Sequence, residues 1–291
     1  MFLLHFLKGL EKEGCITLSA AHLNHGWRPE ADDEERLCKT TCKNLNIPCF
    51  ANHIKDLDLS VKPNGSKEEM GRTFRRHFFS TVKAKINADY VALAHHQQDQ
   101  QETFFIRLIR GCSLSGLIAM KPVQSFYVRP LLTISKPEIL EHLKKAQISY
   151  AIDQSNDSND FLRNRIRRHI LPALSNVDAR FCQKFQTSLE ALEQENRLLE
   201  EVTDKTFDDI FTNAEDTYIA DKPAFIALNP ALQKRLIIMW LCAENVPFRP
   251  SNGLLEEIIT FISSNRGGTH RIHQDWLIKK QKQQFWIKRT R

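Results

Sequence analysis

Several features that would assign a protein class at once are missing from this 291-residue sequence. No apolar run approaches the ~20 residues of a membrane-spanning helix, and the opening MFLLHFLKGLEKEG lacks the basic flank of a secretory signal peptide. The seven cysteines are scattered and form no Cys-X-X-Cys pair. There is also no Gly-X-Ser-X-Gly elbow of a serine hydrolase. We therefore expect a cytoplasmic protein with reduced thiols and no membrane partner.

The composition is that of an ordinary globular protein. Charged residues make up 26% and hydrophobic residues 42%, which excludes a wholly disordered or collagenous chain. The formal net charge of +6 is a mild excess that allows a polyanionic partner without requiring one. At a prior of ~150 residues per domain, the length suggests about two domains.

The first part of the chain alternates strand-like and helix-like stretches. Continuous apolar strands between amphipathic helices favour an α/β fold with a doubly wound parallel sheet covered on both faces. The expected helices are residues 1–10, 31–45, 65–86, 98–111 and 136–146, and the expected strands or apolar segments are residues 15–23, 48–54, 88–94 and 128–132.

The pattern changes after Pro172. One long amphipathic stretch, residues 181–211, predicts a linking helix, and the polar residues 213–217 predict a loop. Helices are expected over 230–244 and 251–264, followed by short strands near Thr269, Leu277 and Phe285. The domains expected are therefore residues 1–175, a linking helix in 176–214, and a small α+β domain in 215–291.

Two polar clusters follow expected strands, and ligands of open parallel sheets bind beyond the carboxyl ends of the strands. One cluster is residues 22–28, HLNHGWR, and the other is residues 95–103, HHQQDQQET. On a helix, Asp99 and Glu102 lie one turn apart and face the same way. They could bind a cationic amine, hold Mg²⁺ or act as a base, but capping of a helix start explains them equally well.

Metal ligation by histidine and cysteine is the weaker interpretation of this chain. His95 and His96 are adjacent and point different ways, and no further ligand follows at a typical zinc spacing. Cys38, Cys42, Cys49 and His53 also suggest a metal, but Cys38 and Cys42 fall on an apolar helix face and are better explained as core. We therefore expect no metal held by these residues.

Basic clusters indicate a nucleic-acid partner. Arg163, Arg165, Arg167 and Arg168 crowd together without an acid in the run, which favours phosphate binding over a merely solvated helix face. Residues 271–291 carry seven lysines and arginines against one acid, interleaved with Trp276, Phe285 and Trp286. That mixture suits RNA through phosphate contacts and base stacking, although a small domain with aromatic core residues and solvated lysines would look the same.

Together these residues resemble the tRNA(Ile)-lysidine synthase family over most of residues 1–175. The matching pieces occur in the family's order: residues 22–28, Glu68 to Arg72 with Arg75, HHQQDQQETFFIRLIRG from His95, Gly116-Leu117 with Met120, Arg129-Pro130-Leu131-Leu132, Asp153, Ser155-Asn156, and Arg163 to Arg167. The resemblance implies a nucleotide α-hydrolase fold. It implies that ATP and Mg²⁺ adenylate C2 of cytidine 34 in tRNA(Ile) with a CAU anticodon, and that free L-lysine displaces AMP to give lysidine.

The resemblance also implies roles for individual residues. Asp99 and Glu102 would recognise the cationic groups of lysine or assist removal of a proton from its ε-amine, and His95 would orient cytidine or ATP. Arg163, Asn164 and Arg167 would contact the carboxylate of lysine or a tRNA phosphate. Arg72 and Arg75 would steady RNA or the nucleotide, and Arg129 is a further expected substrate-binding residue. The expected cofactor-binding residues are His22, Asn24 and His25. A homodimer is compatible with the family.

Three departures from the family's pattern leave alternatives to the implied function open. The Ser-Gly-Gly-X-Asp-Ser phosphate loop is missing, and we expect either a late start codon or a true truncation. Gln98 stands where the first of two acids is usual, and Arg76 stands where tyrosine is common. One alternative is a catalytically impaired tRNA-binding remnant. The other is a tRNA thiolase of the same superfamily, which the missing Cys-X-X-Cys disfavours.

Overall fold

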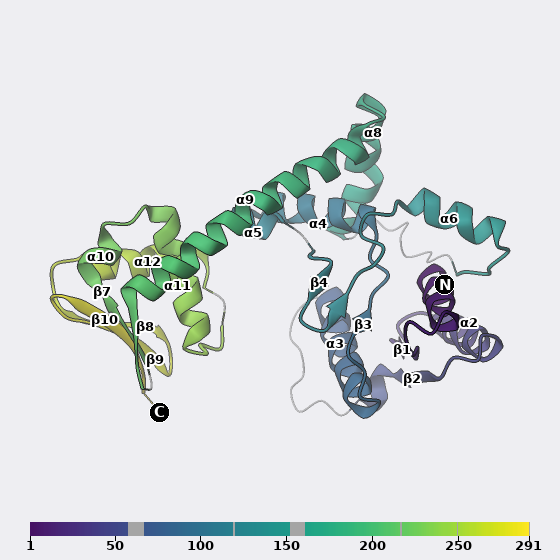
Figure 1. Ribbon diagram of the computed structural model, residues 1–291, viewed down its shortest axis with the longest axis horizontal. Helices are drawn as coiled ribbons and strands as arrows, with labels where there is room; N and C mark the ends of the chain where they lie inside the picture. The colour runs from purple at the N-terminus through teal and green to yellow at the C-terminus, as the bar shows by residue number, and fades with distance from the viewer. Residues whose placement is uncertain (58–66, 119, 152–160, 216, 249, 291) are drawn as a thin grey trace. The chain divides into compact units, whose positions relative to one another are not determined.

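The computed structural model describes residues 1–57, 67–118, 120–151, 161–215, 217–248 and 250–290. The chain divides into two compact units, Met1–Glu190 and Ala191–Arg291. Figure 1 follows both units from the purple amino-terminal helix to the yellow carboxy-terminal strands. Among the described residues, no helix combines the length and apolarity that crossing a bilayer requires.

The first unit begins with two parallel strands and the helices around them. Strand β1 pairs with β2 in register, from Ala20 opposite Cys49 to Asn24 opposite His53. Their carboxyl ends therefore lie side by side, which brings the residues after β1 to one edge. The elements are α1 (Phe2–Lys12), β1 (Ala20–Asn24), α2 (Ala31–Asn44), β2 (Cys49–His53), the short 3₁₀ helix η1 (Ile54–Asp56) and α3 (Lys67–Lys85).

Small apolar clusters fix these elements. Leu18, Cys42 and Ile47 are buried together, so α2 packs beside the chain that enters β1. Leu23 is buried with Phe78 and Val82, which seats α3 on β1. Each fully buried aliphatic or aromatic side chain contributes ~1.5–3 kcal/mol, so these contacts are enough to hold α2 and α3 in fixed positions against the strands.

The second sheet of the first unit positions helix α4. Strand β5 pairs parallel with β3 and antiparallel with β4. Helix α4 starts a few residues after β3, and its first backbone amide, that of Gln97, donates to the carbonyl of Ile134 at 3.0 Å. The elements are β3 (Val91–Ala92), α4 (Gln97–Arg110), α5 (Leu114–Leu117), β4 (Val123–Gln124), β5 (Tyr127–Val128) and α6 (Lys136–Lys145).

The arginine-rich segment forms a helix that packs on α4. It comprises α7 (Leu162–Arg165), the π-helical turn η3 (Ile166–Ile170) and α8 (Leu171–Val177). Ile166 is fully buried and anchors the segment. Helix α9 (Phe181–Ile210) follows, and its Phe185 ring lies 5.1 Å from Phe104 on α4. Two arginines of this segment, Arg163 and Arg167, reach Glu102 on α4, whereas Arg165 and Arg168 are exposed.

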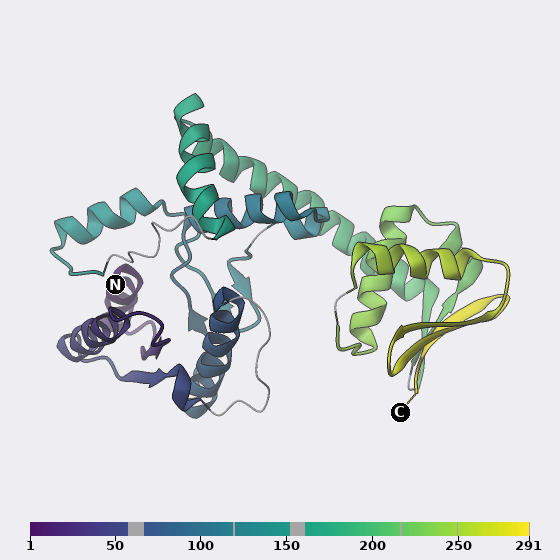
Figure 2. The ribbon, with the colours of Figure 1, turned by 180° about the vertical axis from the view of Figure 1, so that it is seen from behind.

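The second unit is an antiparallel sheet of order β6-β7-β10-β9-β8 with the carboxy-terminal part of α9 and three further helices. Figure 2 shows the helices α10 to α12 gathered against this sheet. Trp240 and Phe285 are fully buried, with ring centroids 5.2 Å apart, and centre the core. The elements are β6 (Phe211–Ala214), β7 (Thr217–Asp221), α10 (Lys222–Ile226), α11 (Pro230–Ala243), α12 (Asn252–Ser263), β8 (Gly268–His273), β9 (Trp276–Lys280) and β10 (Gln284–Arg289).

Most expected helices are confirmed to within two residues, but three other expectations are wrong wholly or in part. The strand expected over 15–23 begins only at Ala20 and ends at Asn24. The apolar run 88–94 forms a strand of only Val91–Ala92, because its partner β5 offers only Tyr127 and Val128 for pairing. Of the loop expected at 213–217, Glu215 is a turn as expected, but Asn213, Ala214 and Thr217 belong to paired strands, with Asn213 opposite Tyr218 and Ala214 opposite Thr217. Glu215 takes a positive φ of 55°, which lets the chain reverse there.

Candidate functional site

The start of α4 carries the predicted catalytic residues. The Asp99 carboxylate accepts from the backbone N–H of His96 at 2.9 Å, through Oδ2, and His96 Nδ1 lies 3.4 Å from the same oxygen. This is the capping role that the sequence left open, and it occupies only Oδ2. The Asp99 side chain is 20% exposed. The capping role therefore leaves Oδ1 available for a cation.

Glu102, one turn further along α4, is a fully buried carboxylate bound by two arginines. Arg167 donates to both of its oxygens, Nε to Oε1 at 2.6 Å and Nη2 to Oε2 at 3.1 Å. Arg163 adds an ion pair, with Nε 3.5 Å from Oε2. A carboxylate removed from water is stable only with such partners. Glu102 thus holds the arginine-rich helix against α4.

His95 stands among four charged groups of the site. Burial lowers the pKa of its imidazole to about 4. The carboxylate of Asp99 opposes that shift, and the guanidinium groups of Arg129, Arg72 and Arg163 reinforce it. At neutral pH the ring is therefore uncharged, with its buried Nδ1 unpaired within the described part of the chain. The structure thus brings together the groups that the sequence placed on separate segments.

The loop after β1 is organised by Asn24, which is 1% exposed. Its Nδ2 donates to Asp32 at 2.8 Å and to Glu35 at 2.9 Å, while its Oδ1 accepts from the backbone N–H of Gly26 at 2.8 Å. All three interactions lie within the chain. Asn24 therefore shapes the loop, and its amide is occupied without any ligand.

His25 and Trp27 form an aromatic pair on that loop. Their ring centroids lie 4.8 Å apart, and Trp27 remains 44% exposed. A Cβ added at Gly71 on α3 would come within 2.9 Å of the Trp27 ring, so glycine makes room for it. Burial, followed by the charges of Arg75, His22 and Arg28, lowers the pKa of His25 to about 4. Burial also lowers the pKa of His22.

The predicted arginines and Asn164 differ in how they are placed. Arg72 and Arg75 are exposed on α3, and Arg75 Nε donates to the carbonyl of Gly71 at 3.3 Å. Arg129 is 6% exposed; its Nη1 donates to the carbonyl of Lys121 at 2.8 Å, while its buried Nε has no partner among the described residues. Asn164 is buried on α7. The two α3 arginines can therefore meet a partner directly, whereas Asn164 cannot.

The structure brings three thiols together, those of Cys38, Cys42 and Cys49, with all Sγ atoms within 4.8 Å of one another. His53 is not among them; its Nε2 lies 3.3 Å from Glu35 and it groups with Asp32 and Glu35 instead. Burial raises the pKa of Cys38 and of Cys42, which opposes the thiolate that a metal needs. The apolar surroundings of Cys42 match the core role expected for it.

Sequence reasoning missed two glutamines that anchor loops around the site. Gln100 binds the backbone of Met120 twice, donating to its carbonyl and accepting from its N–H, both at 2.8 Å. Gln98 accepts from the N–H of Lys136 at the start of α6, at 2.8 Å. Neither has a local sequence signal, because their partners lie 20 and 38 residues away. Asp153, Ser155 and Asn156 lie outside the described residues.

The described residues fit the nucleoside of ATP better than its triphosphate. Unpaired buried nitrogens on His25 and His95 offer polar contacts to a nucleobase or ribose, and the Arg129 Nε offers one to an anion. A triphosphate needs a run of backbone N–H groups, usually from a glycine-rich loop. The positive-φ glycines in the described chain, Gly14, Gly26, Gly111 and Gly268, are isolated from one another. The described residues therefore do not form the phosphate cradle.

Comparisons with known proteins agree with this geometry. The PP-loop domain family matches residues 1–174. The tRNA(Ile)-lysidine synthase of Bacillus subtilis is 34% identical over 256 residues, covering 85% of this chain and 54% of that protein. That of Clostridium tetani is 30% identical over 240 residues, covering 81% and 51%. The chain thus spans about half the length of these curated relatives.

A solved structure shares the fold. The U34-tRNA thiolase NcsA from Methanococcus maripaludis, solved with its [4Fe-4S] cluster, superposes with a TM-score of 0.55 at 20% identity, covering 66% of this chain and 67% of that one. This likeness confirms the expected α/β nucleotide α-hydrolase fold. The match over residues 1–174 leads to one conclusion: the chain belongs to the PP-loop domain family, and its sequence is similar to tRNA(Ile)-lysidine synthases of that family.

Proposed function

We propose that this protein takes part in lysidine formation, joining free L-lysine to C2 of cytidine 34 in tRNA(Ile) with a CAU anticodon. ATP, with Mg²⁺, would supply the adenylate that activates C2. The observation that carries the proposal is the start of α4, where the Asp99 carboxylate lies one turn before the Glu102 carboxylate that Arg163 and Arg167 bind. An amino acid has a cation and an anion to be held, and these groups offer both partners.

In this proposal the Asp99 carboxylate binds the ε-ammonium group of lysine. Its Oδ2 caps α4, and its Oδ1 makes no hydrogen bond within the described part of the chain, so an ammonium can approach without unwinding the helix. The ε-amine has a pKa of ~10.4 in water and must lose a proton before it attacks C2. A carboxylate beside it can hold the ammonium and accept that proton. His95, neutral at pH 7, donates or accepts a hydrogen bond without adding charge.

Glu102 acts through the arginines that it binds. Both of its oxygens are occupied by Arg167, and Oε2 is also close to Arg163. We therefore assign Glu102 the positioning of these guanidiniums, which would meet the carboxylate of lysine or a tRNA phosphate. Asn24 shapes the loop that carries His25, and His22 and His25 would contact the nucleoside end of ATP. We assign no phosphate-binding role to His22, Asn24 or His25.

The test is incorporation of radiolabelled lysine into tRNA. The protein expressed from the full open reading frame is incubated with ATP, Mg²⁺, labelled lysine and a tRNA(Ile) transcript with a CAU anticodon. We expect acid-precipitable label that depends on ATP, and a loss of about 10²-fold or more in Asp99→Asn. Asp178→Asn, at an exposed carboxylate paired with Arg180, is the control and keeps the wild-type rate.

Two results would replace the proposal. Tight tRNA binding without any lysine incorporation would identify a tRNA-binding remnant. Sulfur transfer to tRNA would identify a thiolase. The three clustered thiols argue against this outcome, because the reactive form of a cysteine is the thiolate and burial with Leu18 and Ile47 keeps Cys42 protonated.

A further inference from the structure

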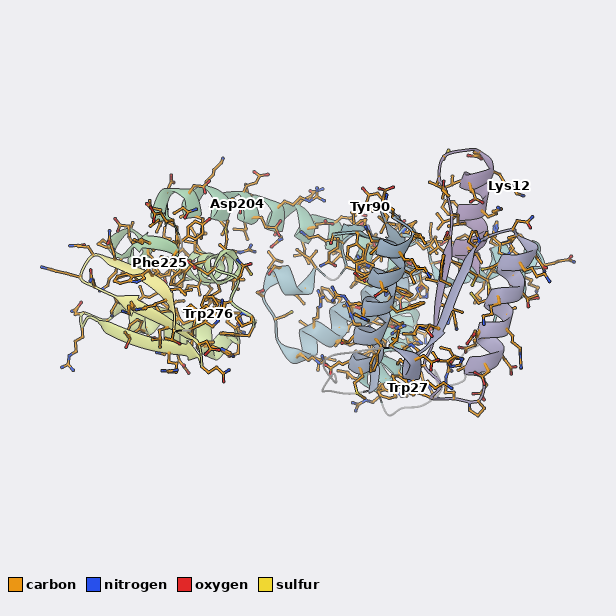
Figure 3. The ribbon with its side chains drawn as sticks, turned by 90° about the horizontal axis from the view of Figure 1, so that it is seen from below. Lys12, Trp27, Tyr90, Asp204, Phe225 and Trp276 are labelled. Carbon is orange, nitrogen blue, oxygen red and sulfur yellow. The ribbon has the colours of Figure 1, made fainter. Side chains whose placement is uncertain are left out.

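Trp27 is an exposed aromatic residue that the proposed chemistry does not use. It follows β1 at the edge where ligands of parallel sheets bind, and 44% of it remains accessible. Figure 3 shows it beside α3, at the opposite end of the first unit from Tyr90. Burying an indole stabilises a fold strongly, so a half-exposed one at this edge calls for a role outside the core.

The ring is held in place from beneath. His25 packs against it with centroids 4.8 Å apart and ring planes inclined by 36°. On the α3 side, the absence of a side chain at Gly71 leaves space for the ring, which would otherwise be 2.9 Å from a Cβ. An aromatic group fixed on one side and open on the other loses little conformational freedom when a second planar group stacks on it.

Positive charge lies along the helix next to the ring. Arg72, Arg75 and Arg76 are exposed on α3, and Arg75 lies one turn after Gly71. Residues three apart on a helix are neighbours, so Arg72 and Arg75 form a pair, whereas the Arg76 guanidinium lies over the Tyr127 ring, 5.9 Å from its centroid. His25 adds no charge at neutral pH, because burial and the nearby arginines hold its pKa at about 4. Cations beside an open aromatic face are the arrangement that single-stranded nucleic acid binds.

We propose that Trp27 is a stacking platform for an unpaired base of an RNA strand, with Arg75 and Arg72 holding the adjoining phosphates. The strand would be part of the tRNA, so the inference rests on the proposed function for its source. An RNA strand fits better than a mononucleotide. Small ligands are enclosed in concave sites, whereas the outer face of Trp27 is open and the arginines extend past it along α3.

The first experiment measures RNA affinity without catalysis. Fluorescence anisotropy gives the dissociation constant of a labelled anticodon stem-loop with a CAU loop for the wild type, Trp27→Ala, Trp27→Phe and the control Tyr90→Ala. Stacking of one base predicts a loss of about 5- to 150-fold for Trp27→Ala. Trp27→Phe keeps an aromatic face and should stay within about 3-fold. Tyr90 is 61% exposed at the other end of the unit, and its removal should change nothing.

A second variant moves the ring without removing it. In Gly71→Ala the new methyl group displaces the Trp27 ring, while alanine favours the helix by up to about 1 kcal/mol over glycine. RNA affinity should fall although α3 is not weakened, as circular dichroism can check. Removing Arg75 should instead reduce the slope of log affinity against log salt by about 1, which Trp27→Ala leaves unchanged.

The outcomes separate this inference from the proposed function. Unchanged RNA affinity in Trp27→Ala, or a wild-type chain that binds no stem-loop, overturns the platform whatever the lysine assay shows. Weaker ATP binding with unchanged RNA binding assigns the ring to the nucleotide and also overturns it. Weaker RNA binding in a chain that incorporates no lysine supports the platform and contradicts only the lysidine assignment.

Discussion

Replacing Glu102 by glutamine tests whether its buried carboxylate holds the arginine helix against α4. The carboxylate is fully buried, and it accepts from Arg167 at 2.6 and 3.1 Å. Glutamine has nearly the same shape, but its Nε2 is a donor and would face a guanidinium donor. Removing one partner of a buried ion pair costs ~3–5 kcal/mol.

The magnitude is reduced because the arginines are not buried. The side chains of Arg163 and Arg167 are 33% and 28% exposed, so water recovers part of the loss. We therefore expect the free energy of unfolding to fall by about 2–4 kcal/mol. For a unit of this size, each kcal/mol lowers the melting temperature by ~2–4 °C, which gives a drop of roughly 4–16 °C.

Thermal unfolding followed by circular dichroism, with urea unfolding as a second measure, provides the assay. Asp178→Asn is the matched control, because its ion pair with Arg180 has side chains 43% and 70% exposed, so water screens their attraction. If Glu102→Gln lowers the melting temperature no more than Asp178→Asn does, the arginine helix is held by apolar packing around Ile166 instead, and our account of Glu102 fails.

Three further predictions concern stability. The free energy of unfolding should fall as the pH drops from about 6.5 to about 4, because the unfolded chain binds protons in that window that folded His25 and His95, with pKa values near 4, do not. His95→Gln should reduce the dependence of the urea unfolding midpoint on pH. A midpoint that rises on acidification would contradict the burial of the His25 and His95 rings. Cys42→Ser should lower the free energy of urea unfolding by about 1–3 kcal/mol, since it buries a hydroxyl among apolar side chains, while exposed Cys15→Ser should leave it unchanged; equal effects would mean that the thiol cluster is not core. Asn24→Ala should lower the free energy of unfolding by about 1–3 kcal/mol and speed hydrogen exchange of the Gly26 amide, which donates to Asn24; slow exchange would show that another acceptor fixes the loop.

Local sequence patterns predicted the helices well because amphipathic spacing is a local property. Helix α9, expected over 181–211, spans Phe181–Ile210, and α6, expected over 136–146, spans Lys136–Lys145 with Ser135 as its cap. Strands were harder, because a strand exists only where a partner is available. The run 88–94 looks like a complete strand, yet β5 pairs with two of its residues.

The site shows the same division between local and distant information. Capping of α4 by Asp99 spans three residues and could be foreseen. The acid that balances the arginine run could not, because Glu102 stands 65 residues before Arg167. The absence of an acid within that run suggested a free phosphate-binding surface, but part of its charge is committed inside the chain. Charge partners of this kind depend on tertiary packing, which spacing does not encode.

Gln98 shows how an uncharged side chain can keep an architectural task while altering electrostatics. Its carbonyl oxygen tethers the first amide of α6, as a carboxylate could do equally well. An amide oxygen performs this tethering with no net negative charge. The surface near Asp99 is therefore more electropositive than it would be with acids at both position 98 and position 99. This lessens its repulsion of a polyanion and weakens its attraction for a free ammonium group. Exchanging this glutamine for glutamate would thus shift the balance between nucleic acid and amino acid while leaving the scaffold intact.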